Sequence, residues 1–190
     1  MGKLRDIVFG RTTPAKANLD NLFAMPSASI TLEVSANLVT TKQAAVCFKP
    51  ASGAAFASTA KDFESVLPLM NPGGDPPTES TDSLGYKWVI VKADDLESLT
   101  TSIHSINSTL EDNGFGPQLL CSVFPFQSTD GAANTYLIYL YKRGTFYPFA
   151  PLGSQRRDNE RELSLQAILA SDLPIEADLE RWFPIWDIPL

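Results

Sequence analysis

Basic and aromatic side chains lie close together in one part of the chain, around the stretch YLYKRGTFYPFAPLGSQRRDN at 139–159. The bases there, including one just beyond the stretch, are Lys142, Arg143, Arg156, Arg157 and Arg161, and the aromatics between them are Phe146, Tyr147 and Phe149. Arginine and tyrosine are enriched at protein interfaces, and the guanidinium fork also suits a carboxylate or a phosphate. The stretch could therefore bind a protein partner, bind a small anion or serve catalysis, or it could be a strand that ends in an exposed turn.

Other residues that could do chemistry are few. The single histidine, His104, and the two cysteines, Cys47 and Cys121, show no CxxC or HExxH spacing and make no zinc pattern. We expect His104 to be a partly exposed helical residue and Cys121 a small core residue, rather than a base and a nucleophile. The glycines at 114 and 116 follow a helical pattern and precede a strand, which is the reverse of a phosphate-binding loop. We therefore expect no metal and no cofactor, and we assign none of these residues a catalytic role.

Charge and length limit the classes further. The chain has 190 residues, enough for one well-packed domain. Its 22 acids outnumber its 15 bases, which argues against nucleic acid as a partner, because such proteins usually present a net basic face. Both cysteines lie in apolar runs, and neither a signal-peptide core nor a run of about 20 apolar residues is present. These features favour a cytoplasmic protein with reduced thiols.

The first sixteen residues are basic and partly apolar. They carry Lys3, Arg5, Arg11 and Lys16 against a single acid, Asp6. Such a segment could touch anionic lipid, although a short helix packed on the domain suits its length better.

The elements that must position these residues follow from hydrophobic periodicity. The pattern predicts helices over 18–24, 54–70, 94–114 and 156–170. It predicts strands over 29–34 (SITLEV), 44–49, 86–93, 118–126, 135–142 and 145–149, the first two joined as a hairpin. Met25-Pro26 is expected to end the first helix, and Asp94 and Asn159 to cap the last two. The tail, 178–190, is expected to lay Trp182, Phe183 and Trp186 on the core.

The order of these elements predicts the fold class. Adjacent strands joined by short turns favour a mainly antiparallel sheet, and helices with one apolar face would cover it. We predict an α+β fold, a two-layer sandwich in a single domain over 1–190. The segment 1–16 is its basic N-terminal part, and 71–85, rich in glycine, proline and small polar residues, is an exposed flexible loop.

Four motifs resemble those of a known family, and they run in order along the chain. They are FGPQLLC at 115–121, YLYKRGTFYPFAPL at 139–152, RRDN at 156–159 and DLERWFPIW at 178–186. They are similar to the PspA-associated protein family PspAB, found mainly in actinobacteria, and NLDNLFAMPSASITLE at 18–33 resembles its opening segment. The resemblance implies a non-enzymatic accessory protein linked to PspA, the membrane-associated coiled-coil protein of phage-shock-type envelope stress responses. It implies no catalytic residues.

The motif residues become candidates for partner binding. They are Lys142, Arg143, Phe146, Tyr147, Arg156, Arg157, Trp182 and Trp186. The working hypothesis is an adaptor that binds an acidic stretch of a PspA-type coiled coil, or anionic lipid near it, at the inner face of the cell membrane. Two alternatives stay open: a small-molecule- or anion-binding domain, or even an enzyme, that uses 142–161, and a secretion-chaperone-like scaffold that forms a symmetric dimer.

Overall fold

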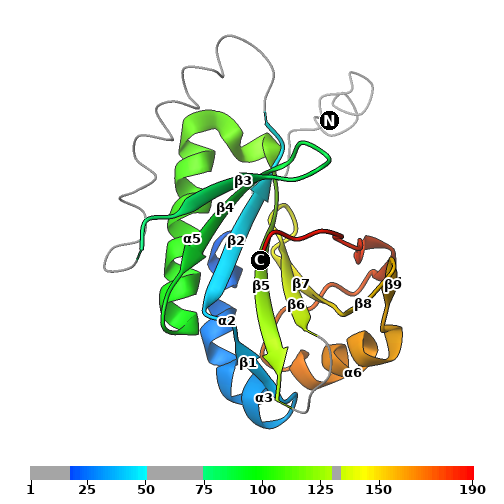
Figure 1. Cartoon of the computed structure of the whole chain (residues 1–190). Helices are drawn as coiled ribbons and strands as arrows, with labels where there is room; N and C mark the ends of the chain where they lie inside the picture. The colour runs from blue at the N-terminus through cyan, green and yellow to red at the C-terminus, as the bar shows by residue number, and fades with distance from the viewer. Residues whose placement is uncertain (1–17, 51–74, 130–133) are drawn as a thin grey trace, which may run out of the picture.

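The fold is a mainly antiparallel sheet with helices on one face. It was analysed in a computed structural model that describes residues 18–50, 75–129 and 134–190 (Figure 1). Seven strands form the sheet in the order β3-β4-β2-β5-β6-β7, with β1 beside β5, and each of these pairings is antiparallel. The strands are β1 Leu38–Thr40, β2 Gln43–Phe48, β3 Thr78–Thr81, β4 Lys87–Lys92, β5 Leu119–Ser128, β6 Thr135–Leu140 and β7 Thr145–Phe149. The predicted α+β class is confirmed.

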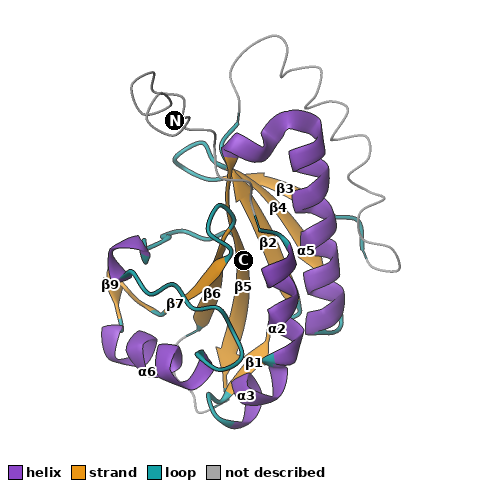
Figure 2. Cartoon of the chain, turned by 180° about the vertical axis from the view of Figure 1, so that it is seen from behind, coloured by secondary structure: helices purple, strands orange, loops and turns teal. Residues whose placement is uncertain are grey.

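The helices gather behind the sheet, as Figure 2 shows. They are the 3-10 helix η1 Asp20–Phe23, α2 Ala24–Ser27, α3 Ser29–Val34, α5 Leu96–Leu110 and α6 Asn159–Leu169. Short helical turns, η3 Glu111–Phe115 and η4 Gly116–Gln118, join α5 to β5. Beyond the main sheet, β8 Pro151–Gly153 and β9 Arg156–Arg157 form a small hairpin, and η5 Leu179–Arg181 lies in the tail.

Alternation of side chains along the strands gives the sheet two apolar faces. On β2, Ala44 and Val46 pack toward the helices, whereas Ala45 and Cys47 belong to the cluster on the other face. The helix-side cluster is the larger of the two. The second cluster is completed by the C-terminal tail, which contributes Trp182 and, partly buried, Ile185, Trp186, Ile188 and Leu190. The tail therefore covers the face of the sheet on which no long helix of the described chain packs.

The prediction of a strand and a hairpin at 29–34 was wrong, because SITLEV forms the helix α3. Of its three apolar residues only Leu32 is buried, whereas Ile30 and Val34, four residues apart, are each 74% exposed. A short alternating run is equally compatible with a helical turn when the chain before it is already helical. The amide of Ala28 does bond the carbonyl of Ala24 at 3.2 Å, so the helical course continues past Pro26.

Pro26 was predicted to end the first helix, but it lies inside α2. Proline is tolerated in the first turn of a helix, where its missing N–H needs no intrahelical acceptor.

Two helix caps lie one residue away from their predicted positions. Asp95, not Asp94, accepts the Ser98 amide at 2.7 Å and begins α5. Asp158, not Asn159, accepts the Arg161 amide at 3.0 Å and begins α6, so the helix predicted from 156 starts later. In both cases an acid at the last non-helical position takes the cap.

Part of the predicted loop 71–85 is ordered as a strand. Thr78–Thr81 forms β3, a polar edge strand that pairs with β4. Its sequence has no apolar alternation because an edge strand that is exposed on its side chains needs none. The predicted helix at 54–70, the segment 1–16 and the turn at Asp130-Gly131 lie outside the described residues. Among the helices that are described, none has the length and apolarity to cross a membrane.

Candidate functional site

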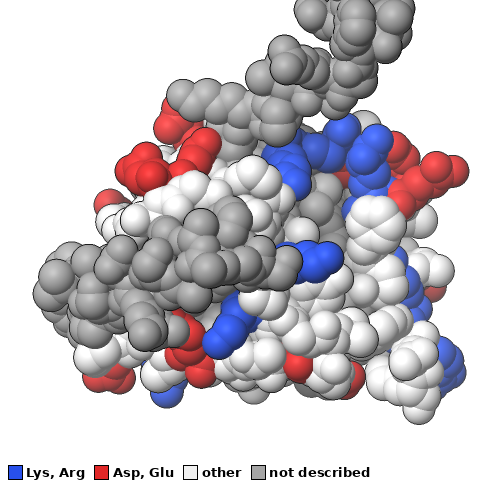
Figure 3. Space-filling model, turned by 90° about the horizontal axis from the view of Figure 1, so that it is seen from above, with Lys and Arg blue, Asp and Glu red and all other residues white. Residues whose placement is uncertain are grey.

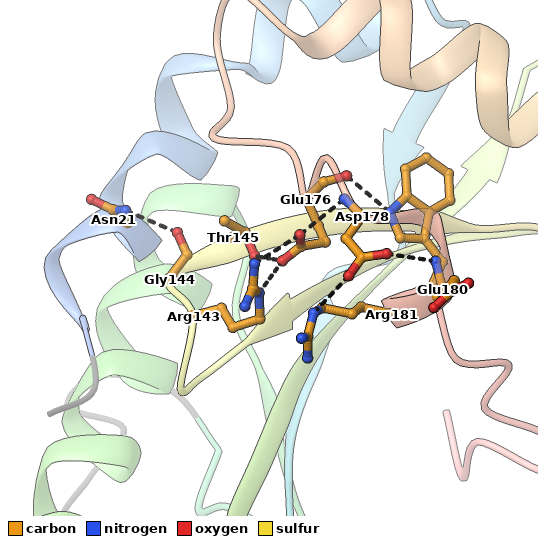
Figure 4. A network of polar contacts seen from close by, with 9 residues as sticks. Asn21, Arg143, Gly144, Thr145, Glu176, Asp178, Glu180 and Arg181 are labelled. Carbon is orange, nitrogen blue, oxygen red and sulfur yellow. Dashed lines mark hydrogen bonds and ion pairs between the residues drawn. The ribbon is translucent and has the colours of Figure 1, made fainter. Parts of the chain in front are cut away.

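The basic-aromatic stretch is divided among several elements. Lys142 and Arg143 lie in the tight turn between β6 and β7, which reverses at Gly144 with φ +68. A Cβ on Gly144 would come within 2.8 Å of the Cβ of Asn18, so only glycine fits this turn without displacing its neighbour. The side-chain Nδ2 of Asn21 donates to the Gly144 carbonyl at 2.8 Å and joins the first helical turn to the β6–β7 turn (Figure 4).

Arg143 does not point freely into solvent but binds a buried carboxylate. Its guanidinium donates to both oxygens of Glu176, at 3.1 Å from Nη2 to Oε1 and through Nε to Oε2. Thr145 Oγ1 donates to Oε2 at 2.8 Å, and the amide of Asp178 donates to Oε1 at 3.1 Å. Figure 4 shows these donors around the Glu176 carboxylate, which is 2% exposed. Burial alone would raise the pKa of Glu176, but these hydrogen bonds lower it to about 2.

Arg157 makes a second pair of the same kind. Its guanidinium binds Glu162 with Nε–Oε1 and Nη2–Oε2 distances of 2.9 Å. Nη1 also donates to the carbonyl of Trp182 at 2.6 Å, and the guanidinium carbon lies 5.4 Å from the ring centre of Phe149. Glu162 is buried and accepts the Ala150 amide at 2.9 Å. Arg157 therefore joins α6, the hairpin and the tail.

Three of the candidate aromatics are part of the core. Phe146 and Tyr147 in β7 are buried, and so is Trp182, whose ring stacks 6.1 Å from that of Tyr147. Trp182 Nε1 donates to the Glu176 carbonyl at 3.0 Å. These side chains have no surface that a partner could touch. Trp186 is half-buried with its ring 5.2 Å from Phe149.

Phe183 departs from the predicted clamp, because its side chain is 61% exposed while its carbonyl accepts the Tyr147 hydroxyl at 2.8 Å. The backbone is thus held and the ring is presented to solvent. Leu179 in η5 and Leu152 in β8 are also large exposed apolar residues.

The β8–β9 hairpin and the tail lie side by side, and both carry exposed side chains. Figures 1 and 2 both place the β8–β9 hairpin beside η5, and the Arg157–Trp182 hydrogen bond joins the two. We call Leu152, Arg156, Leu179 and Phe183, all exposed, the hairpin–tail surface. The tip of the hairpin is in the left-handed region at Ser154 and Gln155, with φ of 51 and 54. Positive φ at both loop residues is what a two-residue type I′ hairpin turn requires, so the turn itself sets the shape of the tip.

Charge is unevenly distributed over the chain. The helical segments 18–37 and 94–118 contain seven acids and no Lys or Arg, which leaves fifteen of each sign in the rest. Figure 3 shows Lys and Arg side chains close together on one end of the molecule, with acidic groups on both sides. Lys49 and Lys142 border one turn, because the Lys49 amide bonds the Gln118 carbonyl at 3.0 Å and Lys142 Nζ the Pro117 carbonyl at 2.9 Å.

A family model described as PspAB, PspA associated protein B, matches residues 1–190. The chain belongs to the PspAB family. The predicted resemblance is thereby confirmed, and the family supports an accessory role linked to PspA. No curated protein and no solved structure matches the chain.

The PspAB motifs can now be related to the structure. YLYKRGTFYPFAPL runs through β6, β7 and β8, RRDN contains β9 and the cap of α6, and DLERWFPIW is η5 and the tail after it. Two of the arginines in these motifs hold buried glutamates inside the molecule. Much of what distinguishes the motifs therefore serves to fasten the tail to the sheet.

Sequence reasoning missed Glu162 and Glu176. Glu162 lies in the first turn of α6, where an acid usually complements the helix dipole at the surface, yet it is buried on the same side of the helix as Leu165 and Leu169. The spacing 162, 165, 169 is that of one helical face and could have revealed it. Glu176 follows no such periodicity, and its partner Arg143 lies 33 residues away.

The residues that the sequence analysis considered for a metal site or a nucleophile can also be placed. Within the described residues no group of three or more His, Cys, Asp and Glu side chains could hold a metal ion. His104 is half-buried on α5 with its ring 4.8 Å from Phe23, and Cys121 is a core residue, as predicted.

Proposed function

We propose that this PspAB chain is a non-enzymatic adaptor that binds a protein partner through its hairpin–tail surface, within a PspA-linked envelope stress response. The observation that carries the proposal is the exposure of the Phe183 ring on a backbone that two hydrogen bonds to the domain hold at its flanks. An aromatic anchor on a rigid backbone loses little entropy on binding, and such residues dominate interface energies. Leu152 in the hairpin and Leu179 in η5 are further exposed apolar side chains on the same two elements.

The exposed bases of the basic-aromatic stretch favour an acidic, partly apolar partner helix, such as one in a PspA-type coiled coil. Arg156 is exposed in β9 and free to bind a carboxylate. Lys142 is exposed at the β6–β7 turn. Arg143 and Arg157, which the sequence suggested for this role, each bind an internal glutamate instead. They support partner binding indirectly, because they hold the tail that presents Phe183.

The same pairing argues against the small-anion alternative. An anion site or an active site built on 142–161 would need its arginines to converge on a ligand. Here Arg143 and Arg157 each bind a carboxylate of the protein itself, so an incoming anion would have to displace a buried glutamate from its arginine.

We also propose a cytoplasmic location with peripheral contact to anionic lipid. Residues 1–16 carry four bases and one acid. The chain reaches the domain at Asn18, whose carbonyl accepts the Tyr139 hydroxyl beside the β6–β7 turn with its Lys142 and Arg143. The basic segment is therefore joined to the domain beside a turn that carries the exposed Lys142, and sedimentation with anionic against neutral vesicles would test the contact.

Co-purification with PspA tests the adaptor role. Phe183→Ser combined with Leu179→Ser should abolish capture of PspA from the native cell while the melting temperature stays within a few degrees. Ile30→Ser with Val34→Ser is the matched control, because it also removes two exposed apolar side chains, here from α3. Unchanged capture by the Phe183/Leu179 variant would reject the hairpin–tail surface, and no capture by the natural sequence would reject PspA as the partner.

A further inference from the structure

Cys47 and Cys121 face each other across the centre of the sheet. Cys47 in β2 is the register partner of Cys121 in β5. Both thiols are free, both lie in the cluster on the face covered by the tail, and they are 4% and 6% exposed. The strand register therefore places the two thiols next to each other, although they are far apart in the sequence.

The spacing of such a pair is close to that of a disulfide. Residues directly opposite in an antiparallel pair have Cβ atoms about 4.5–5.5 Å apart, and a disulfide needs about 3.5–4.5 Å. The register of β2 against β5 shifts between Cys47 and Phe48, and such an irregularity lets one strand adjust locally. The two thiols are close enough that Cys121 is the main cause of a raised pKa at Cys47. Bond formation would need a movement of about an ångström or less.

The C-terminal tail covers this face of the sheet (Figure 1). Trp182 is held through both its side chain and its backbone. Its Nε1 donates to the Glu176 carbonyl, and its own carbonyl accepts from Arg157 Nη1. Beyond Phe183 the contacts change in kind. Residues 184–190 make no hydrogen bond to any described residue and rest on apolar contacts such as Trp186 on Phe149. The last part of the tail is thus the weakest-held part of the cover.

We propose that Cys47 and Cys121 are a redox modification site, which forms a reversible disulfide within the chain when the tail lifts and stays reduced while the tail is closed. The oxidant is a low-molecular-weight disulfide. One cysteine thiolate attacks it and displaces a thiolate, and the second cysteine then attacks the mixed disulfide and displaces the other. The two cysteines lose two protons and two electrons, and the oxidant is reduced to two thiols.

The closed tail suppresses this reaction for two reasons. It excludes the oxidant from two buried sulfurs. In addition, the hydrogen bond from the neighbouring thiol and the burial of the site raise the pKa of Cys47, so little thiolate is available. Opening the tail would remove the steric block and hydrate the site. The inference does not depend on the adaptor role, since it concerns the face under the tail.

Incubation of the full chain with oxidised glutathione tests the proposal. We expect the thiol count in denaturant to fall from two to none, with an intact mass lower by two hydrogen atoms and recovery of both thiols with a reductant. Cys47→Ser and Cys121→Ser should each give only a mixed disulfide with glutathione. Persistence of both thiols, or a product that links two chains, would overturn the proposal.

The role of the tail is tested by the rate. Trp186→Ala removes a main apolar contact of residues 184–190 and should speed oxidation on the order of tenfold. Ile30→Ser on the helix side should leave the rate unchanged. Should Trp186→Ala fold poorly, Trp186→Leu, which keeps apolar bulk without the ring, should give an intermediate rate. Equal rates for the natural chain and both Trp186 variants would refute protection by the tail.

Discussion

Glu176 should be the most costly single carboxylate to neutralise in the described chain. Glu176→Gln keeps the shape of the side chain and removes its charge, which four hydrogen bonds now stabilise. We expect Glu176→Gln to lower the free energy of unfolding at neutral pH, almost wholly because the Glu176 charge and its hydrogen bonds are lost. Its partner Arg143 is 43% exposed, so water can solvate the guanidinium in the variant and no buried cation is stranded.

The magnitude follows from the pKa of Glu176. A fall from 4.5 in the unfolded chain to about 2 in the folded protein corresponds to about 3 kcal/mol of stabilisation. Solvent screens the exposed side of Arg143, so about 2 kcal/mol is the expected loss for Glu176→Gln at pH 7. Because the folded-state pKa is the lower one, this stabilisation is complete above about pH 5 and disappears as the pH falls toward about 2.

Urea unfolding of the natural chain and of Glu176→Gln, followed by tryptophan fluorescence at pH 7 and at pH 3, measures the effect. The difference between the two proteins should shrink by more than half at pH 3. Asp94→Asn is the control, because Asp94 pairs with Lys42 at the surface and is almost fully exposed. A Glu176→Gln penalty that is below about 0.5 kcal/mol, or that is the same at both pH values, would refute the linkage argument.

Three further substitutions test the packing, the turn and the cap. Trp182→Ala should cost about 3–5 kcal/mol in urea unfolding, because it empties a buried site between the tail and the sheet. Gly144→Ala should lower the melting temperature well below that of Gly85→Ala: both have positive φ, but only at position 144 does the new Cβ meet a neighbour within 3 Å. Asp158→Ala should cost about 1 kcal/mol and reduce helical circular dichroism, whereas Asn159→Ala should change neither, and the reverse order would contradict the assigned cap.

Periodicity in the sequence was enough to predict most of the sheet and both long described helices. The strands β2, β4, β5, β6 and β7 lie where alternating or continuous apolar runs predicted them, because their side chains are buried on at least one face. The segments that failed are those with little to bury. α3 buries only Leu32, so the alternation of SITLEV does not report burial, and β3 is polar throughout and carries no apolar pattern.

The site was harder to predict than the fold. The motif arginines were identified correctly as unusual, but their partners Glu162 and Glu176 were not, since an ion pair between distant elements leaves no local signature. Composition suggested a basic surface, whereas two of its bases are neutralised inside the molecule. Phe183 shows the converse: its neighbours Trp182 and Trp186 pack inward, and only the local backbone geometry decides that its ring points out.

The contacts at the β6–β7 turn also constrain the order of assembly during synthesis. Tyr139 reaches back to Asn18 across 121 residues, and Gly144 to Asn21 across 123, while the tail at Glu176 closes on the same turn from the other end of the chain. The contacts between the first helical turns and the β6–β7 turn therefore cannot form until β6 and β7 have left the ribosome, and the second face stays uncovered until the tail follows. Folding that depends on such distant pairings is slow, so the nascent chain holds Leu22 and Met25 incompletely packed for much of its synthesis. A chaperone that holds the emerging N-terminal third would shorten the time for which this surface is open to aggregation.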